Sequence, residues 1–224
     1  MSATAVEREE GAAEALLSPV ERVSELCFGL FMAITFTGAM SVVTPAGGEV
    51  RAMVVAAFGC NIAWGLVDAV MYLVRTLTER ARTLNLALAV RAAPDTGTGR
   101  RHVERALSSV ASKLVTEAEV EAVRARIVAM ASLPERPHLH RRDALAAALI
   151  FLIVLGSTVP IVLPFAFTTD IALAKNGSRL VALAMLFAAG RSLGRHAGYG
   201  GLRTGFSMMG LGAAVIVAIM AFGG

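Results

Sequence analysis

The stretch AMVVAAFGCNIAWGLVDAVMYLV, residues 52–74, decides the fold class, because only Asn61 and Asp68 in it are strongly polar. A helix needs about 20 predominantly apolar residues to cross a hydrocarbon layer of about 30 Å. An acidic side chain near the centre of a bilayer costs about 2.5–3.5 kcal/mol on insertion scales, so a membrane helix usually keeps one only for a purpose. The stretch predicts a membrane span and marks Asp68 as a candidate functional residue.

Four further stretches are apolar enough to extend this prediction to the whole chain. Of the 224 residues, 56% are hydrophobic, and the mean hydropathy is +0.66. Soluble domains average about 45–50% apolar residues. We therefore predict an all-α polytopic membrane protein with five transmembrane helices in the lipid bilayer. The other four spans are expected at residues 23–44, 144–169, 171–194 and 206–222, and Lys175 and Arg179 interrupt the third of these.

The basic residues predict the orientation of these spans. Cytoplasmic connections of membrane proteins carry an excess of Lys and Arg. Residues 75–142 contain 13 of them, and placing this connection inside puts 18 of the 21 Lys and Arg on the cytoplasmic side. The N-terminus is then cytoplasmic and the C-terminus outside, with a bacterial inner membrane as the expected location. The basic balance follows from this topology and is no reason to expect a nucleic-acid partner.

The long connection predicts a cytoplasmic helical insertion between the second and third spans. PDTGTG at 94–99 interrupts the helical pattern that leaves the second span. Two amphipathic stretches follow, and Thr116-x-x-Glu119 has the pattern of a capping box at a helix start. We therefore divide the chain into an interfacial segment 1–22, spans one and two at 23–75, the insertion at 76–142, and spans three to five at 143–224.

The polar residues of the second span form a narrow stripe. Asn61, Gly65, Asp68, Tyr72 and Arg75 recur at steps of three and four residues, so they share one face of a helix, which should face the protein interior or a wet cavity. Two hypotheses remain open for Asp68. It is a cation or proton site, or it is structural, paired with a buried arginine or protonated and bonded to Asn or Thr.

Three further side chains are candidate ligands beside Asp68 and Asn61. Met71 flanks the stripe and offers a thioether. If the first span starts near Val23 and the second near Ala52, counting 1.5 Å per residue places Met32 and Thr35 about level with Asp68.

The chain resembles a bacterial member of the vacuolar iron transporter family over roughly residues 20–224. The resemblance rests on ERVSELCFGLFMAITFTGAMSV at 21–42, the polar stripe, the inserted helices, DALAAALIFLIVLGSTVPIVLPFAF at 143–167 and the glycine-rich end from residue 186. It implies a five-helix homodimer with its path at the dimer interface. It also implies export or sequestration of Fe²⁺ or Mn²⁺ from the cytoplasm in exchange for protons, with the metal as substrate and no tightly bound cofactor.

Two departures from the family pattern affect the expected metal site. Where the family has Phe-Gly-x-x-Asp-Gly in its first span, this chain has Phe28-Gly29-Leu30-Phe31-Met32-Ala33. The acid and the thioether either have exchanged helices, to Asp68 and Met32, or the transport site has been lost. The insertion also has few glutamates; Glu117 and Glu121, one turn apart, either share a cation or form a solvated face.

The leading functional hypothesis is therefore a divalent cation transporter, and the alternative is a transport-inactive membrane scaffold that acts through its helical insertion. We do not expect an enzyme, because the sequence contains no His-Glu-x-x-His, no Gly-x-Ser-x-Gly and no paired membrane aspartates.

Overall fold

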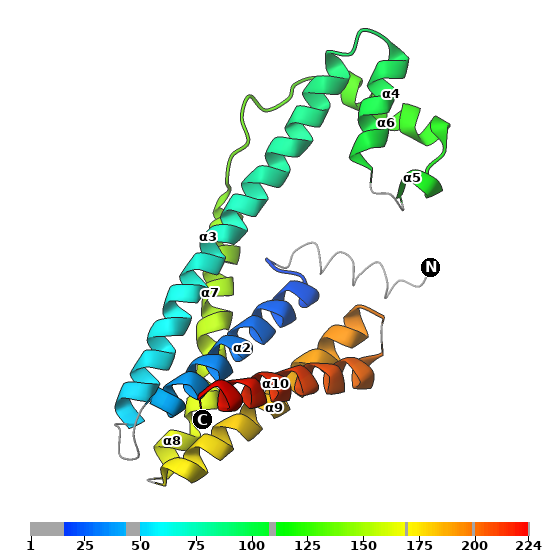
Figure 1. Cartoon of the computed structure of the whole chain (residues 1–224). Coiled ribbons are helices and arrows are strands. Elements are labelled where there is room, and N and C mark those ends of the chain that lie inside the picture. The colour runs from blue at the N-terminus through cyan, green and yellow to red at the C-terminus, as the bar shows by residue number, and fades with distance from the viewer. Residues whose placement is uncertain (1–15, 44–49, 108–110, 169, 199, 224) are drawn as a thin grey trace, which may run out of the picture. The chain divides into compact units, whose positions relative to one another are not determined.

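The computed structural model describes residues 16–43, 50–107, 111–168, 170–198 and 200–223, and every regular element in these ranges is a helix (Figure 1). Five helical stretches are long and apolar enough to cross a membrane, which confirms the predicted number of spans. They are Pro19–Ala39, Val54–Arg91, Arg141–Phe167, Ile171–His196 and Gly201–Ala221. Of the residues named above, positions 1–15, Thr44, Thr169 and Gly224 lie outside the described ranges.

The chain divides into two compact units, which we describe separately. Unit 1 comprises residues 1–71 and 142–224, and unit 2 comprises residues 72–141. Unit 2 begins four residues before the predicted insertion, residues 76–142, and ends one residue before it does. The helix α3 (Val50–Arg91) belongs to both units, since it continues without a break from the apolar stretch into the polar one.

The first helix of unit 1, α2 (Pro19–Val43), begins one turn earlier than its apolar pattern predicts. The Ser18 hydroxyl accepts from the backbone N–H of Glu21 at 3.2 Å, and the Glu21 carboxylate accepts from the backbone N–H of Ser18 at 2.7 Å. This reciprocal pair is a capping box, and Pro19 occupies the first helical position, where a missing N–H costs nothing. Local capping therefore sets the start of the helix.

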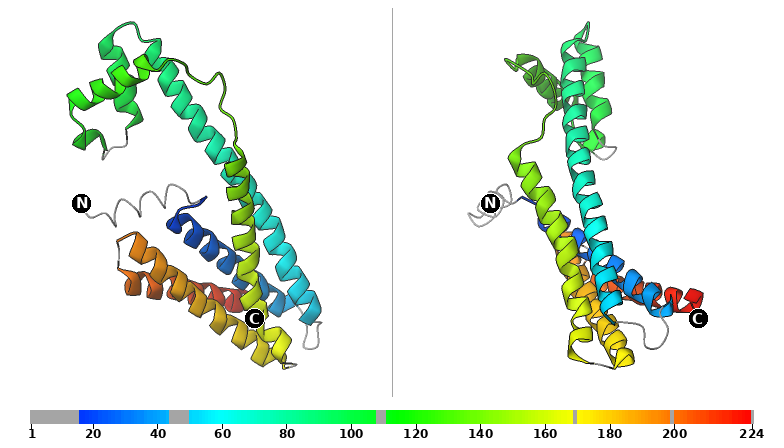
Figure 2. Two further views of the ribbon diagram at one scale, coloured as in Figure 1. Left: turned by 180° about the vertical axis from the view of Figure 1, so that it is seen from behind. Right: turned by 90° about the vertical axis from the view of Figure 1, so that its left-hand side faces the viewer.

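The core of unit 1 lies where α2, α7 (Arg141–Val162), α9 (Ile171–His196) and α10 (Gly201–Gly223) meet. α2 packs against both α9 and α10, while α7 runs beside the unit 1 part of α3 (Figure 2). Six residues form the buried centre: Leu30, Ala33, Ile34, Ile161, Ala182 and Leu186.

Two prolines shape the end of α7. Pro160 lies inside the helix, where it cannot donate to the carbonyl four residues earlier. Pro164 lies beyond the last residue of α7, at the start of the short helix α8 (Pro164–Phe167). The third predicted span is therefore a helix followed by a separate turn of helix.

The helices α9 and α10 pack closely in opposite directions because glycines line their contact. A side-chain carbon built on Gly190 would lie 2.8 Å from the backbone oxygen of Thr204 and 2.7 Å from the Met208 side chain. Gly198 and Gly200, between the two helices, have φ angles of +76° and +86°, which side-chain-bearing residues rarely adopt. These glycines serve packing and the turn within one chain.

Unit 2 has its own small core. Val90 of α3, Val103 of α4 (Thr96–Ala106) and Val120 of α6 (Glu117–Ala129) are buried together. The predicted break after the second span is present, and α4 starts within it because the Asp95 carboxylate accepts from the backbone N–H of Thr98. The predicted Thr116–Glu119 capping box is confirmed at the start of α6, which follows the short helix α5 (Ala111–Leu114).

Candidate ion site on the inward face of α3

The inward face of α3 in unit 1 is the predicted polar stripe. Ala57 and Asn61 are fully buried, Gly65 and Ala69 are buried, and Asp68 is half-buried. The positions between them, including Ile62, Trp64, Leu66, Val67 and Val70, are exposed large apolar side chains, as suits a lipid-facing surface. The expectation that the stripe faces the protein interior is therefore confirmed for Asn61 and Gly65. Asp68 and Tyr72 are half-buried, and the expectation is wrong for Arg75, which is exposed.

Asn61 holds three helices together through its amide nitrogen. Nδ2 donates to the backbone oxygen of Gly29 on α2 at 3.4 Å, to that of Val154 on α7 at 3.3 Å, and to the hydroxyl of Thr158 on α7. The helices come this close because position 29 is a glycine, since any side-chain carbon there would meet the Ser157 side chain and the Val154 backbone oxygen.

Two buried oxygen atoms in this region have no hydrogen-bond partner among the described residues: Asn61 Oδ1 and Asp68 Oδ2. The orientation of the Asn61 amide is fixed by the Gly29 and Val154 carbonyls, which only accept hydrogen bonds, so Oδ1 must be the outward-pointing atom. Buried polar atoms are nearly always satisfied in folded proteins, so each exception needs an explanation. Both oxygens are acceptors that suit a bound cation, and the carboxylate oxygen of Asp68 also suits a proton.

The buried-arginine alternative for Asp68 finds no support among the described residues. Asp68 forms no ion pair with a described residue; the ion pairs in this part of the chain include Arg82–Glu79, Arg100–Glu117 and Arg124–Glu121. Arg75, two turns along the same helix, instead lies over the ring of Tyr72, 5.8 Å from its centroid. A hydrogen bond from Asn61 or Thr to the orphan oxygen is likewise not seen in this part of the chain.

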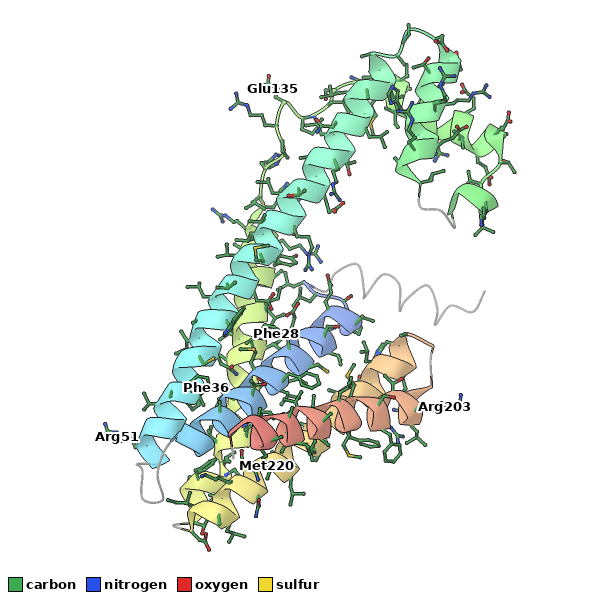
Figure 3. All side chains as sticks on the ribbon, in the orientation of Figure 1. Phe28, Phe36, Arg51, Glu135, Arg203 and Met220 are labelled. Atoms are coloured by element: carbon green, nitrogen blue, oxygen red, sulfur yellow. The ribbon has the colours of Figure 1, made fainter. Side chains whose placement is uncertain are left out.

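Met32 and Thr35 are not at the level of Asp68. The Phe28 and Trp64 rings meet edge-on with centroids 6.2 Å apart, which sets the register of α2 against α3 (Phe28 is labelled in Figure 3). Met32 is four residues after Phe28, and Asp68 is four residues after Trp64. Because the two helices run in opposite directions, Met32 and Asp68 lie on opposite sides of this contact, roughly 12 Å apart along the axes at 1.5 Å per residue. The predicted shared level is wrong because α2 starts at Pro19 instead of Val23, so its residues lie one turn deeper.

The remaining sulfur atoms do not complete a ligand set either. Met71 is 55% exposed and so does not lie on the inward face with Asn61. Cys27 and Cys60 are both free thiols, Cys27 buried and Cys60 half-buried. No group of three or more His, Cys, Asp or Glu side chains suited to a metal ion occurs among the described residues.

The two predicted glutamates of unit 2 are bound to arginines. Both carboxylate oxygens of Glu121 accept from Arg124, at 2.6 to 3.0 Å, and these hydrogen bonds hold the pKa of Glu121 below its usual value. Glu117 lies 3.7 Å from Arg100. The structure thus favours the solvated-face interpretation, and the last glutamate of the insertion, Glu135, is also exposed (Figure 3).

The sequence interpretation missed one buried acid near the stripe. Asp143, in the first turn of α7, is 7% exposed. Since Asn61 contacts Val154 and Thr158 on the antiparallel α7, Asp143 lies roughly 9 Å beyond the level of Asp68, at 1.5 Å per residue. Because Asp143 follows Arg141 and Arg142 in the sequence, it is expected to lie in the membrane–water interface. Only the packing of the helices shows that it is buried.

No protein-family model, curated protein or solved structure matches this chain. The likeness to vacuolar iron transporters therefore stays an expectation from the residues, and the function has to be argued from the geometry of α3.

Proposed function

We propose that the protein is a multi-pass membrane transporter for a divalent cation, and that the ion interacts with Asp68 on its way across. The observation that carries this proposal is the pair of unpartnered, inaccessible acceptor oxygens, Asn61 Oδ1 and Asp68 Oδ2, on the inward face of one candidate span. An intramembrane acid is costly and, when no basic partner neutralises it, its negative charge calls for a cation or a proton.

The substrate class rests on the ligand chemistry and on the family likeness. Carboxylate and amide oxygens suit Mn²⁺ and Fe²⁺, and carboxylate suits a proton equally, so exchange of metal against protons at one acid is chemically consistent. We propose Fe²⁺ or Mn²⁺ moving out of the cytoplasm. A second buried acid, Asp143 on α7, lies further along the same direction as Asn61 and Asp68.

A transport-inactive membrane scaffold is the second candidate, and one observation favours it. The described side chains offer Asp68 no second strong ligand, since Met32 and Thr35 are at another level and Met71 is exposed. In that case Asn61 would be a structural residue, and Asp68 a protonated acid without a transport role.

Metal uptake into proteoliposomes separates the two functions. The parent protein should carry Fe²⁺ or Mn²⁺ in a manner that depends on a proton gradient, with Zn²⁺ and Ca²⁺ as comparison ions. In Asp68→Asn the flux should fall by about tenfold or more, since even changes to the partners of metal ligands cost about 10–100-fold in affinity. The variant should express at least as well as the parent, because the change removes an insertion cost of about 2.5–3.5 kcal/mol.

Glu79→Gln is the matched control, because Glu79 is an exposed acid on the same helix. It should transport like the parent. Stable Asp68→Asn protein with full metal flux would overturn the assignment of Asp68, and a parent protein that moves none of the four ions would favour the scaffold.

A further inference from the structure

Unit 2 contains a cavity that the transport function does not use. It has a volume of about 470 Å³ and lies between α3, the end of α6 and the segment that follows α6. Small-ligand sites typically enclose about 300–1,000 Å³ behind mostly apolar walls with a few polar groups. Eight of the fourteen lining residues are apolar: Leu84, Leu86, Ala87, Ile127, Met130, Leu133, Pro134 and Pro137.

The charged groups of the cavity gather at one end and are mainly basic. Arg80, Arg136, His138 and His140 line it there, with Glu79 as the one acid among the lining residues. The Glu79 carboxylate is bound by Arg82 at 3.0 Å.

This basic end is held together by contacts within unit 2. Arg80 Nη1 donates to the backbone oxygen of His138 at 2.7 Å, which ties α3 to the segment after α6. The His138 and His140 rings are 4.5 Å apart between centroids, so both imidazoles are at this same end.

We propose that this cavity binds a free fatty acid, with its carboxylate between Arg80 and Arg136 and its tail along Leu84, Ala87 and Leu133. The planar guanidinium of arginine binds a carboxylate through two parallel N–H···O hydrogen bonds. The apolar wall would bury the acyl tail away from water, which is favourable. With one basic end and one apolar wall, the cavity suits an anion with a single acyl chain.

Photolabelling of the full chain in phosphatidylcholine liposomes tests this site. A long-chain fatty acid with a diazirine at its tail should form adducts in peptides that contain Leu84 to Ala87 and Ile127 to Leu133. The fatty alcohol of the same length, which carries the same label and no charge, should give several-fold fewer adducts there.

Two variants and a control assign the adducts to the cavity. Arg136→Glu reverses one charge at an exposed position, and Ala87→Phe fills the apolar part; each should reduce fatty-acid labelling several-fold. Arg126→Glu, an exposed basic residue of α6 outside the cavity, should leave it unchanged. If Ala87→Phe fails to fold, Arg136→Glu alone decides, because its side chain supports no packing.

Three outcomes would overturn the proposal. Equal labelling by the acid and the alcohol would mean an unselective apolar surface. Stronger cavity labelling by photoreactive phosphatidylglycerol than by the fatty acid would mean a bilayer lipid. Adducts confined to residues outside the cavity would mean that no ligand of this class enters it. None of these readouts depends on metal flux, so they are independent of the transport proposal.

Discussion

Asn61 and Asp68 share one face of α3 but are held by different interactions. The donors of Asn61 are bound to acceptors on two other helices, so its position is fixed by the fold. The orphan oxygen of Asp68 is bound to nothing in the described part of the chain. This difference separates a residue that builds the site from one that is available to a ligand.

The polar stripe was predictable from the sequence, but the partners of its residues were not. Spacing along one helix fixes which side chains share a face. The partners of Asn61 are 32 to 97 residues away in the chain, and they depend on how α2 and α7 approach α3. The same dependence explains the misplaced Met32 and the missed Asp143.

Removing the Asn61 amide should destabilise the protein. Asn61→Ala leaves buried acceptors on α2 and α7 without their donor, and losing such a partner costs about 1–3 kcal/mol. Thermal unfolding of the full chain in mild detergent should show the loss, and Asn85→Ala, at an exposed position of α3, should stay within about 0.5 kcal/mol of the parent. In combination with Thr158→Val the two losses should be less than additive. Additive losses would mean that Asn61 and Thr158 do not interact.

Helix ends in this protein follow local capping signals more closely than hydropathy. Ser18, Asp95 and Thr116 each accept from a backbone N–H of the following turn. Thr116-x-x-Glu119 was identified from the sequence, whereas the equivalent Ser18-x-x-Glu21 was missed because the apolar pattern of the first span starts later.

Acid should weaken the start of α6. The backbone N–H and the hydroxyl of Thr116 both donate to the Glu119 carboxylate and hold its pKa below the ordinary 4.5. A lowered folded pKa means that the stabilisation is complete above pH 4.5 and is lost as the pH falls through the lower folded value. Amide protection factors in α6, corrected for the intrinsic exchange rate, should fall over this range. In Thr116→Ala the protection factors should be lower at neutral pH and should change less with acid. An equal response to acid in both proteins would exclude the Thr116–Glu119 interaction as the cause.

Gly190 of α9 should not tolerate a side chain, whereas Gly210 of α10 should. Gly190→Ala brings a carbon to 2.8 Å from the Thr204 backbone oxygen, which cannot move away as a side chain can. Overpacking of this kind costs about 1–3 kcal/mol. Gly210→Ala meets nothing within 4 Å and should be neutral or stabilise α10 by up to about 1 kcal/mol. Thermal unfolding of the two variants in the same detergent compares them directly, and equal stability would contradict the close packing of α9 and α10.

At the scale of the whole molecule, two features that would suit contact between subunits are used within one chain. The small residues Gly190 and Gly194 of α9 already face α10 of the same chain. The apolar stripes of unit 2 meet in its own core, where Val103, Leu107, Val120 and Ile127 pack around Val90. Val123 and Met130 stay exposed, at 43% and 52%. The proposal of a homodimer therefore rests on the family likeness alone.

The number of candidate spans and the helical fold class were readable from composition because a bilayer imposes one strong rule. In hydrocarbon every backbone group must be bonded within its own segment, so long apolar runs form helices. Packing between those helices obeys no comparable rule, since apolar contacts with lipid and with protein are similar. The packing is then determined by glycines that let two helices come close and by buried amides such as Asn61. Neither can be assigned before it is known which helices are neighbours.

The orientation of the spans can be tested on the whole chain with reporter fusions. Five crossings put the two termini on opposite sides, and 18 of the 21 Lys and Arg fall on the side that we assign to the cytoplasm. An alkaline phosphatase fused after residue 224 should therefore be active and a fluorescent protein there dark. Fusions that end after Gly198, between α9 and α10, should show the reverse. This second fusion is the control, since removing α10 changes the side without changing the basic residues of unit 2. A C-terminal reporter that is active only in the cytoplasm would overturn the orientation, and with it the proposed outward direction of transport.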